Sequence, residues 1–322
     1  MFKEKLFKVL KIVIPISIGI YLTWYFFSNS SVAEREHIMV AFKGANYWWI
    51  AVALILAFFS HLSRAYRWKF LLAPLGYKPK LSLMYHSVMI GYIINLTIPR
   101  SGELARAGYF SKYQKASADK VFGTIVVERV IDLLMFGLVI LIAGFLQTDQ
   151  DQFNQIKQSQ EADFPSWILP TVLITGLTFT VIIFFLKKLR EKLIKFIKGI
   201  LEGCLTILKL DQKTAFIFHT FFIWGAYLAM FWLTAFALPE MHNISINATF
   251  ACFVAGAIAI GVTPGGVGLY PIMVASVLTG LYGYEGEVAK SFSMLMWSTQ
   301  TLFIVILGLV SLFAIQNHKK QA

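Results

Sequence analysis

The chain has 322 residues, of which 57% are hydrophobic and 14% charged, and its formal net charge is +12. A soluble domain carries roughly 25% charged residues, so this composition predicts an integral membrane protein and leaves no room for a soluble catalytic domain. The basic residues border apolar runs and form no patch interleaved with aromatic side chains, which argues against nucleic acid as a partner and favours membrane phospholipids with anionic headgroups.

Six apolar runs predict transmembrane helices, because each is long enough to cross a hydrocarbon core of about 30 Å. The first run follows four lysines and could pass for a signal peptide, but no small-residue cleavage site follows it, so we expect an uncleaved anchor helix. The pattern is that of an all-α integral membrane protein. The predicted spans are residues 12–27, 47–63, 121–146, 167–186, 216–238 and 292–315.

Two further apolar regions, residues 81–109 and 248–282, are each interrupted by proline and glycine. Proline removes a backbone donor and glycine permits backbone angles closed to other residues, so each region should be a helix that stops partway. In lipid such a break is tolerated only where protein or a water-filled cavity surrounds it, and paired breaks point to a transporter's binding site. The predicted hinge positions are Pro99 and Gly102 in the first break and Pro264, Gly265, Gly266 and Gly268 in the second.

Loop charge predicts the orientation, since lysine and arginine favour the cytoplasmic side of short membrane loops. Of the 29 lysines and arginines, 24 lie at the two ends of the chain and in residues 64–80, 100–120 and 187–213. This distribution places both termini on the cytoplasmic side of the cytoplasmic membrane. The first interrupted region has basic flanks and the second does not, so we expect two re-entrant helical hairpins of opposite orientation.

The chain then contains two inverted repeats, each made of a span, a hairpin and a span, which is a transporter layout. Between them a basic amphipathic helix over residues 187–198 should lie along the inner membrane surface, although an ordinary positive-inside linker explains its charges equally well. The predicted units are residues 1–46 with the anchor helix, 47–146 as first repeat, 147–215 as outer loop, span and linker helix, and 216–322 as second repeat with the basic C-terminus.

Ionisable residues at membrane depth are costly and by default functional. Glu128, Arg129 and Asp132 lie within about one turn of the third span, at a spacing that lets them pair. An ion-pair cluster that locks helices together explains them as well as a role in handling substrate or protons does, and the two roles are compatible.

The first break brings together a second polar group, and Arg64 and Arg67 reach it from the end of the preceding span. The group consists of Asn95, Arg100, Glu103 and Arg106. The planar fork of arginine suits phosphate oxygens, and a helix that begins near Ser101 would point free amides at an anion, so we expect a lipid headgroup with a phosphate here. Arg64 and Lys69 are expected to be interfacial positive-inside residues. We expect the phosphate to be attracted by Arg100, Arg106 and Arg129, and these arginines to be positioned by Glu103, Glu128 and Asp132.

The second break carries no charge, so its expected contribution is exposed backbone, close helix approach or a hinge. Other chemistry is not indicated. Cys204 and Cys252 lack metal-type spacing, the six histidines are scattered, and no Ser-His-Asp grouping or nucleotide-binding glycine pattern occurs. We therefore expect no catalytic residue, metal or cofactor, and we interpret His61 and His86 as structural.

Five short motifs occur in a specific order along the chain. They are residues 64–68 (RAYRW), 95–99 (NLTIP), 102–106 (GELAR), 128–132 (ERVID) and 264–268 (PGGVG). Together they resemble the flippase-like membrane domain family of lysylphosphatidylglycerol synthase. The resemblance implies a stand-alone transmembrane member without the synthase domain, and a domain that moves aminoacylated phospholipid across the membrane. Many members carry an acidic residue shortly after the glycine-rich motif, where this chain has Tyr270 and Pro271.

The resulting hypothesis is a translocase for an anionic or aminoacylated phospholipid, or for a related lipid-linked phosphate. Because no ATP-binding motif is found, transport must be downhill or coupled to an ion or proton gradient. Two alternatives stay open: a membrane-embedded enzyme that acts on a lipid-linked substrate, and a membrane scaffold without transport activity.

Overall fold

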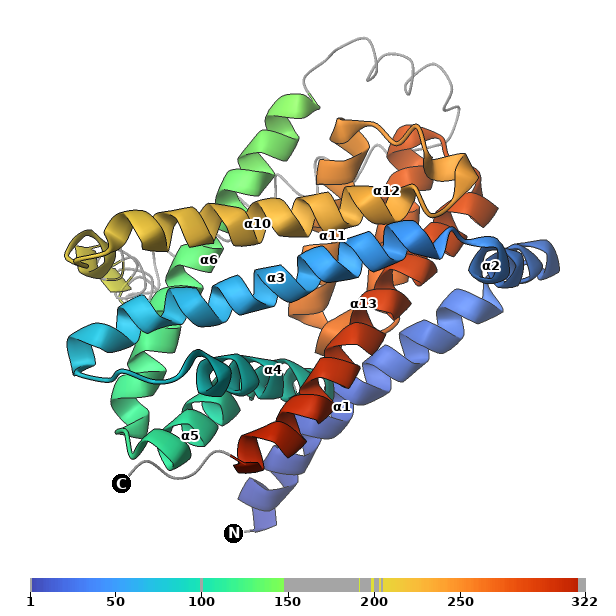
Figure 1. The fold of residues 1–322 in the computed structure, drawn as a ribbon. Coiled ribbons are helices and arrows are strands. Elements are labelled where there is room, and N and C mark those ends of the chain that lie inside the picture. The colour runs from blue at the N-terminus through green and yellow to red at the C-terminus, as the bar shows by residue number, and fades with distance from the viewer. Residues whose placement is uncertain are drawn as a thin grey trace.

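The computed structural model describes residues 2–98, 101–147 and 205–317, together with positions 191, 198, 199 and 203. Throughout these ranges the regular structure is helical, as expected for an all-α protein (Figure 1). Several predicted features lie outside the described residues. They are the span over 167–186, most of the linker over 187–198, the basic residues 319–320, and Pro99 and Arg100.

The N-terminal part consists of α1 (Phe2–Ser28) and α2 (Val32–Gly44). The start of α2 is fixed by a capping box, in which the Ser31 hydroxyl accepts from the Glu34 amide and the Glu34 carboxylate accepts from the Ser31 amide. Glu34 also pairs with Lys290 at 2.7 Å, which ties α2 to the beginning of α13 (Gly286–Ala314).

The chain between α2 and residue 147 forms four helices. A short helical turn, η1 (Ala73–Leu75), ends at Gly76, whose φ of 82° permits the left-handed stop. The chain is interrupted again between Thr97 and Gly102. The helices are α3 (Tyr47–Leu72), α4 (Leu81–Thr97), α5 (Gly102–Gln114) and α6 (Ala118–Leu146).

The last third of the chain repeats this order of a long helix, two shorter helices and a long helix. The two shorter helices are again separated by a break, here the turn η3 (Pro264–Gly266). The turns η2 (Pro239–Met241) and η4 (Ile315–Asn317) follow the first and last helices. The helices are α10 (Lys213–Ala235), α11 (Ile246–Val262), α12 (Leu269–Tyr282) and α13.

The most extensive helix contact joins α3 and α10, which lie side by side (Figure 1). They are antiparallel, because the Asn46 amide before α3 donates to the Ala237 carbonyl after α10, while Arg67 near the end of α3 donates to Thr220 near the start of α10. The buried stripe of α3 recurs at steps of three and four residues, the spacing of one helix face. Its members are Ile50, Ala53, Ala57, Ser60, Arg64 and Arg67.

The two groups of four helices also exchange contacts. Helix α4 packs on α13, and α11 packs on α6. Gly308 of α13 allows α4 and α13 to pack closely, because a methyl group added to it would lie 2.5 Å from the Cβ atom of Ile93 in α4. Each pair of shorter helices therefore rests on the last long helix of the other group.

Three described stretches have both the length and the hydropathy of a membrane span: α3 with η1 (29 residues), α10 (23 residues) and α13 (29 residues). The predicted spans over residues 12–27 and 121–146 lie within α1 and α6. The shorter helices differ in kind, because the 17 residues of α4 or α11 extend only about 26 Å. The chain is thus a membrane-type helical protein with two pairs of helices that are individually short for a bilayer.

Candidate functional site

The break between α4 and α5 is held by an asparagine. The Asn95 side-chain oxygen accepts a hydrogen bond of 2.7 Å from the Gly102 amide, one of the amides that the start of a helix leaves unpaired. The Asn95 amide nitrogen lies 3.4 Å from the Glu103 carboxylate. Gly91 and Gly102 let the two helices touch, since a methyl group at Gly102 would collide with the Gly91 carbonyl and with Asn95.

Next to this break lies a buried ion-pair cluster centred on Glu128 of α6, whose side chain has no exposed surface. Arg106 of α5 donates to both of its oxygens, at 2.9 and 3.1 Å. Arg64 of α3 donates to it at 2.9 Å, and an Arg67 nitrogen lies 3.8 Å away. One carboxylate therefore faces three guanidinium groups from two other helices.

Asp132, one turn further along α6, is the second buried carboxylate of the cluster. It accepts from Arg64 at 2.6 Å and from Arg67 at 2.9 Å. The two α3 arginines thus join both acidic residues of α6. Charge-assisted bonds of this kind are short and strong, and they hold α3, α5 and α6 in one arrangement.

The cluster reaches the surface at one edge, where Arg129 is 40% and Glu103 is 22% exposed. Their side chains lie 3.3 Å apart, and Arg129 also lies 3.4 Å from Asp132. Arg64, Arg67 and Arg106 are all at most 3% exposed. Arg129 is therefore the arginine of this cluster whose side chain is substantially exposed, although its Nε atom is buried.

Neutral side chains complete the cluster. The Arg106 guanidinium stacks on the Trp68 ring, 3.9 Å from its centroid, and the Trp68 indole donates to Thr124 at 2.8 Å. From α10, Thr220 accepts from Arg67 at 3.0 Å and Tyr227 accepts from Arg64 at 3.3 Å. Helix α10 therefore contributes acceptors but no charge to this site.

The charges do not balance. Among the described residues, three buried arginines face the two carboxylates of Glu128 and Asp132, which gives a net charge of +1 (3 − 2), and the Arg129–Glu103 pair leaves that sum unchanged. Removing these groups from water is costly, and mutual pairing compensates only where the geometry is good. The excess positive charge is a feature that an anionic ligand could neutralise.

The structure changes the expectation for Arg64. Interpreted from sequence as an interfacial residue, it is 3% exposed and paired with both carboxylates of α6, because Glu128 and Asp132 face α3 rather than lipid. Arg67, expected from the sequence near the polar group of the first break, belongs to the same cluster. Trp68, Thr220 and Tyr227 also belong to it and were absent from the predicted set. The motif at residues 64–68 was the available signal, since it carries two arginines three positions apart on one helix face.

The remaining predicted residues are distributed as follows. Asn95 and Glu103 lie at the break, and Glu128 and Asp132 lie inside the cluster. Arg106 is enclosed by Glu128 and Trp68, so its donors face protein. Pro99 and Arg100 lie outside the described residues.

The second break packs closely against three helices, α1, α4 and α13. Gly265 has a φ of 59°, its carbonyl accepts from the Trp297 indole at 2.9 Å, and a methyl group on it would collide with Leu96 of α4. The second break therefore contacts the last turn of α4, directly before the first break. Gly268, with a φ of 70°, lies against the backbone of α1 at Leu22 and Thr23.

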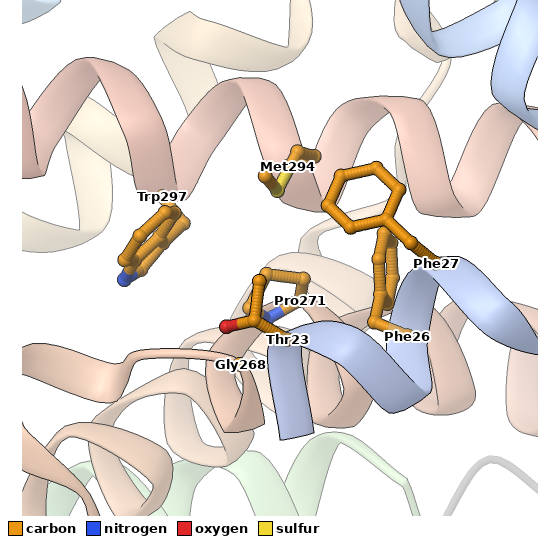
Figure 2. A pocket seen from close by; sticks show the side chains of 7 residues that line it. All are labelled: Thr23, Phe26, Phe27, Gly268, Pro271, Met294 and Trp297. Atoms are coloured by element: carbon orange, nitrogen blue, oxygen red, sulfur yellow. The ribbon is translucent and has the colours of Figure 1, made fainter. Parts of the chain in front are cut away.

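A small apolar cavity adjoins this second break (Figure 2). It lies where α1, the start of α12 and α13 meet, and no charged side chain lines it. Among the described residues, no group of three or more histidine, cysteine, aspartate or glutamate side chains could hold a metal ion. The lining residues are Thr23, Phe26, Phe27, Gly268, Pro271, Met294 and Trp297.

Comparison with known proteins identifies the family. A UPF0104 membrane protein of Methanocaldococcus jannaschii is 30% identical over 118 residues, a match that spans 35% of each chain. The match thus spans about a third of that relative's length. No solved structure matches. The model of the lysylphosphatidylglycerol synthase TM region matches residues 12–308, and the chain belongs to this family of membrane domains.

Proposed function

We propose that this protein is a translocase that moves a lipid with an anionic phosphate headgroup across the cytoplasmic membrane. The observation that supports the proposal is the buried cluster, which has a net charge of +1 among the described residues, and whose partly exposed arginine, Arg129, lies beside the first break. Ionisable groups at membrane depth are costly and mark substrate pathways. Membrane phospholipids are the proposed partners.

The proposed membrane topology has six spans, two re-entrant hairpins of opposite orientation, and both termini in the cytoplasm. In the two groups of four helices, α3 corresponds to α10, α4 to α11 and α6 to α13. With this correspondence, the contact of α4 with α13 is equivalent to that of α11 with α6, and the antiparallel pair of α3 and α10 is equivalent to itself. This pattern supports inverted repeats. The short lengths of α4 and α11 support hairpins that enter and leave by one face.

In the proposed mechanism, the headgroup phosphate binds Arg129 and displaces Glu103 from it. Arginine binds phosphate oxygens through parallel donors, and the excess positive charge of the cluster favours an anion over a neutral headgroup. Glu128 and Asp132 keep the inner arginines in place, and Asn95 holds the start of α5 beside the ligand. Arg100, if it faces the same break, adds a further cation.

The second, uncharged break is proposed to supply movement. Gly265, Gly266 and Gly268 all have positive φ values, a conformation that other residues adopt only at a cost. Since Gly265 touches Leu96 in the last turn of α4, we propose that a shift of α4 is transmitted to the second break. Both pairs of helices would then move together during access, driven by a lipid gradient or by coupling to ions or protons.

Reconstitution tests the proposal. The purified full chain is placed in vesicles with acyl-labelled anionic, aminoacylated or zwitterionic phospholipids, with and without ion and proton gradients, and transbilayer movement is measured. We expect faster movement of anionic lipids, a strong reduction by Arg129→Gln, and no reduction by Arg35→Gln, which removes an exposed arginine of α2.

No acceleration for any of these lipids under either gradient would refute translocation. Chemical conversion of the lipid without transbilayer movement would instead identify a membrane enzyme. Unchanged transport by Arg129→Gln would remove this arginine from the headgroup site.

A further inference from the structure

A buried histidine near the charged cluster has no role in the proposed mechanism. His61 of α3 is 5% exposed, and neither of its ring nitrogens has a hydrogen-bond partner among the described residues. Buried polar groups are nearly always paired, and an unpaired one costs about 1–3 kcal/mol, so each exception requires an explanation. The structure therefore does not support the expectation that His61 is a structural residue whose hydrogen bonds are satisfied.

The location of His61 connects it with the proposed pathway. It precedes Arg64 by about one turn of α3, and its ring packs edge-on against Tyr92, with 5.2 Å between the ring centroids. Tyr92 lies on α4 one turn before Asn95, the residue that holds the first break. Movement of α4 away from α3 would therefore uncover the imidazole next to the headgroup site.

Other neutral groups without partners occur on the same two helices. The Ser60 hydroxyl of α3 is buried and unpaired, as is the hydroxyl of Tyr85, which lies two turns before Tyr92 on the same face of α4. No acidic side chain contacts His61 among the described residues, and its charged neighbour is Arg64. The unpaired atoms are therefore hydrogen-bonding groups that suit an uncharged polar ligand.

We propose that His61 is a second binding site for the transported headgroup and that it binds a hydroxyl group carried beyond the phosphate. A neutral imidazole has one donor nitrogen and one acceptor nitrogen, which point away from each other, and a hydroxyl can accept from the first or donate to the second. An ammonium group has donors only and could satisfy just one nitrogen. This inference rests on the proposed function and narrows the substrate class to phospholipids with hydroxylated headgroups.

The experiment compares two lipids of equal charge that differ in the hydroxyls. Acyl-labelled phosphatidylglycerol and acyl-labelled phosphatidylethanol are tested in the same vesicles with the purified full chain. One neutral hydrogen bond between the His61 ring and a headgroup hydroxyl predicts up to about tenfold faster movement of phosphatidylglycerol. His61→Phe should abolish this preference, His61→Gln should keep part of it, and His242→Phe on an outer loop should leave it intact.

A second measurement does not depend on transport. Without lipid, His61→Phe should unfold at the same or a higher temperature than the native chain, because it removes unpaired polar atoms. Phosphatidylglycerol should raise the unfolding temperature of the native chain more than phosphatidylethanol does, and this difference should vanish in His61→Phe.

The outcomes separate the two proposals. Absence of lipid movement with a preserved difference in unfolding temperature would overturn translocation but keep the hydroxyl site. Equal movement of both lipids by the native chain, or an unchanged preference in His61→Phe, would overturn the His61 proposal and leave translocation intact. A His61→Phe variant that is destabilised without lipid would show a structural role and overturn it as well.

Discussion

Glu128 is the residue on which the packing of three helices depends. Its carboxylate accepts from Arg64 and Arg106 and lies within 3.8 Å of Arg67, so it brings together α3, α5 and α6. Removing one partner of a buried ion pair is more destabilising than replacing both partners by apolar residues, because the remaining charge stays unpaired in a medium of low polarity. Loss of the Glu128 carboxylate would therefore leave buried arginines without enough opposite charge.

Replacing Glu128 by glutamine should therefore destabilise the protein strongly. The amide keeps the shape, but among the described residues it leaves three buried guanidinium groups with Asp132 as their one buried counter-charge, and we expect a loss of about 3–5 kcal/mol. Thermal unfolding in detergent measures it. Glu240→Gln, which alters an exposed carboxylate of η2, is the control and should change little. Equal stability of the two variants would contradict the bracing role.

Part of this cluster was predictable from sequence. The spacing of Glu128 and Asp132 placed both carboxylates on one face of a helix, and ionisable residues at membrane depth had to find partners. Which partners they would find was not predictable, because Arg64 lies 64 positions away and its side of α3 depends on how the helices pack. Periodicity fixes the face of a helix, and tertiary packing decides what that face meets.

At the scale of elements, the positions of the two breaks were predictable from the sequence, but the structural role of the second break was not. Pro264 and three glycines excluded a continuous helix, and the chain does turn there, with positive φ at all three glycines. The sequence left backbone exposure, close approach and hinge open. Close approach is what the structure shows, with Gly265 against Leu96 and Gly268 against the backbone of α1.

Gly268→Ala should consequently disturb the packing of α1. Its methyl group would lie 2.5 Å from the Thr23 nitrogen and 2.7 Å from Leu22, so α1 must shift, in addition to the cost of a left-handed conformation of about 1–2 kcal/mol. Gly283→Ala is a matched control with a φ of 67° and open space around it. Hydrogen exchange of α1 should accelerate in the first variant and stay unchanged in the second, and equal exchange in both would contradict this contact.

For the whole molecule, α2 is a link between the N-terminal part and the last long helix. Glu34 pairs with Lys290, and the His37 ring lies 2.9 Å from the Ser291 hydroxyl. Burial tends to raise the pKa of Glu34, but the Lys290 ammonium and the Ser31 donors outweigh it, so the pKa lies below its ordinary value of 4.5.

This lowered pKa predicts that acid loosens α2. A carboxylate whose folded-state pKa is depressed stabilises the fold above its ordinary value, and that contribution is lost as the pH falls below 4.5 through the lowered value. The pair is partly exposed, so the effect should be about 0.2–1 kcal/mol. Hydrogen exchange of α2, corrected for intrinsic rates, measures it. Lys290→Met should flatten the pH dependence, and an unaltered profile would show that the pair does not hold α2.

The contacts between the two groups of helices lead to a last prediction about motion. If α4 moves against α13 during transport, fixing Ile93 to Gly308 should stop it. A pair of cysteines at these positions starts with Cβ atoms 2.5 Å apart, and a small separation reaches the mean disulfide value of about 3.8 Å. In a background of Cys204→Ser and Cys252→Ala, oxidation should reduce lipid movement by about tenfold or more, and a reductant should restore it. Each single-cysteine variant controls for the substitution itself. A fully cross-linked protein that transports at the rate of its reduced form would show that α4 and α13 stay together, and movement would then have to occur between α11 and α6 or within the breaks.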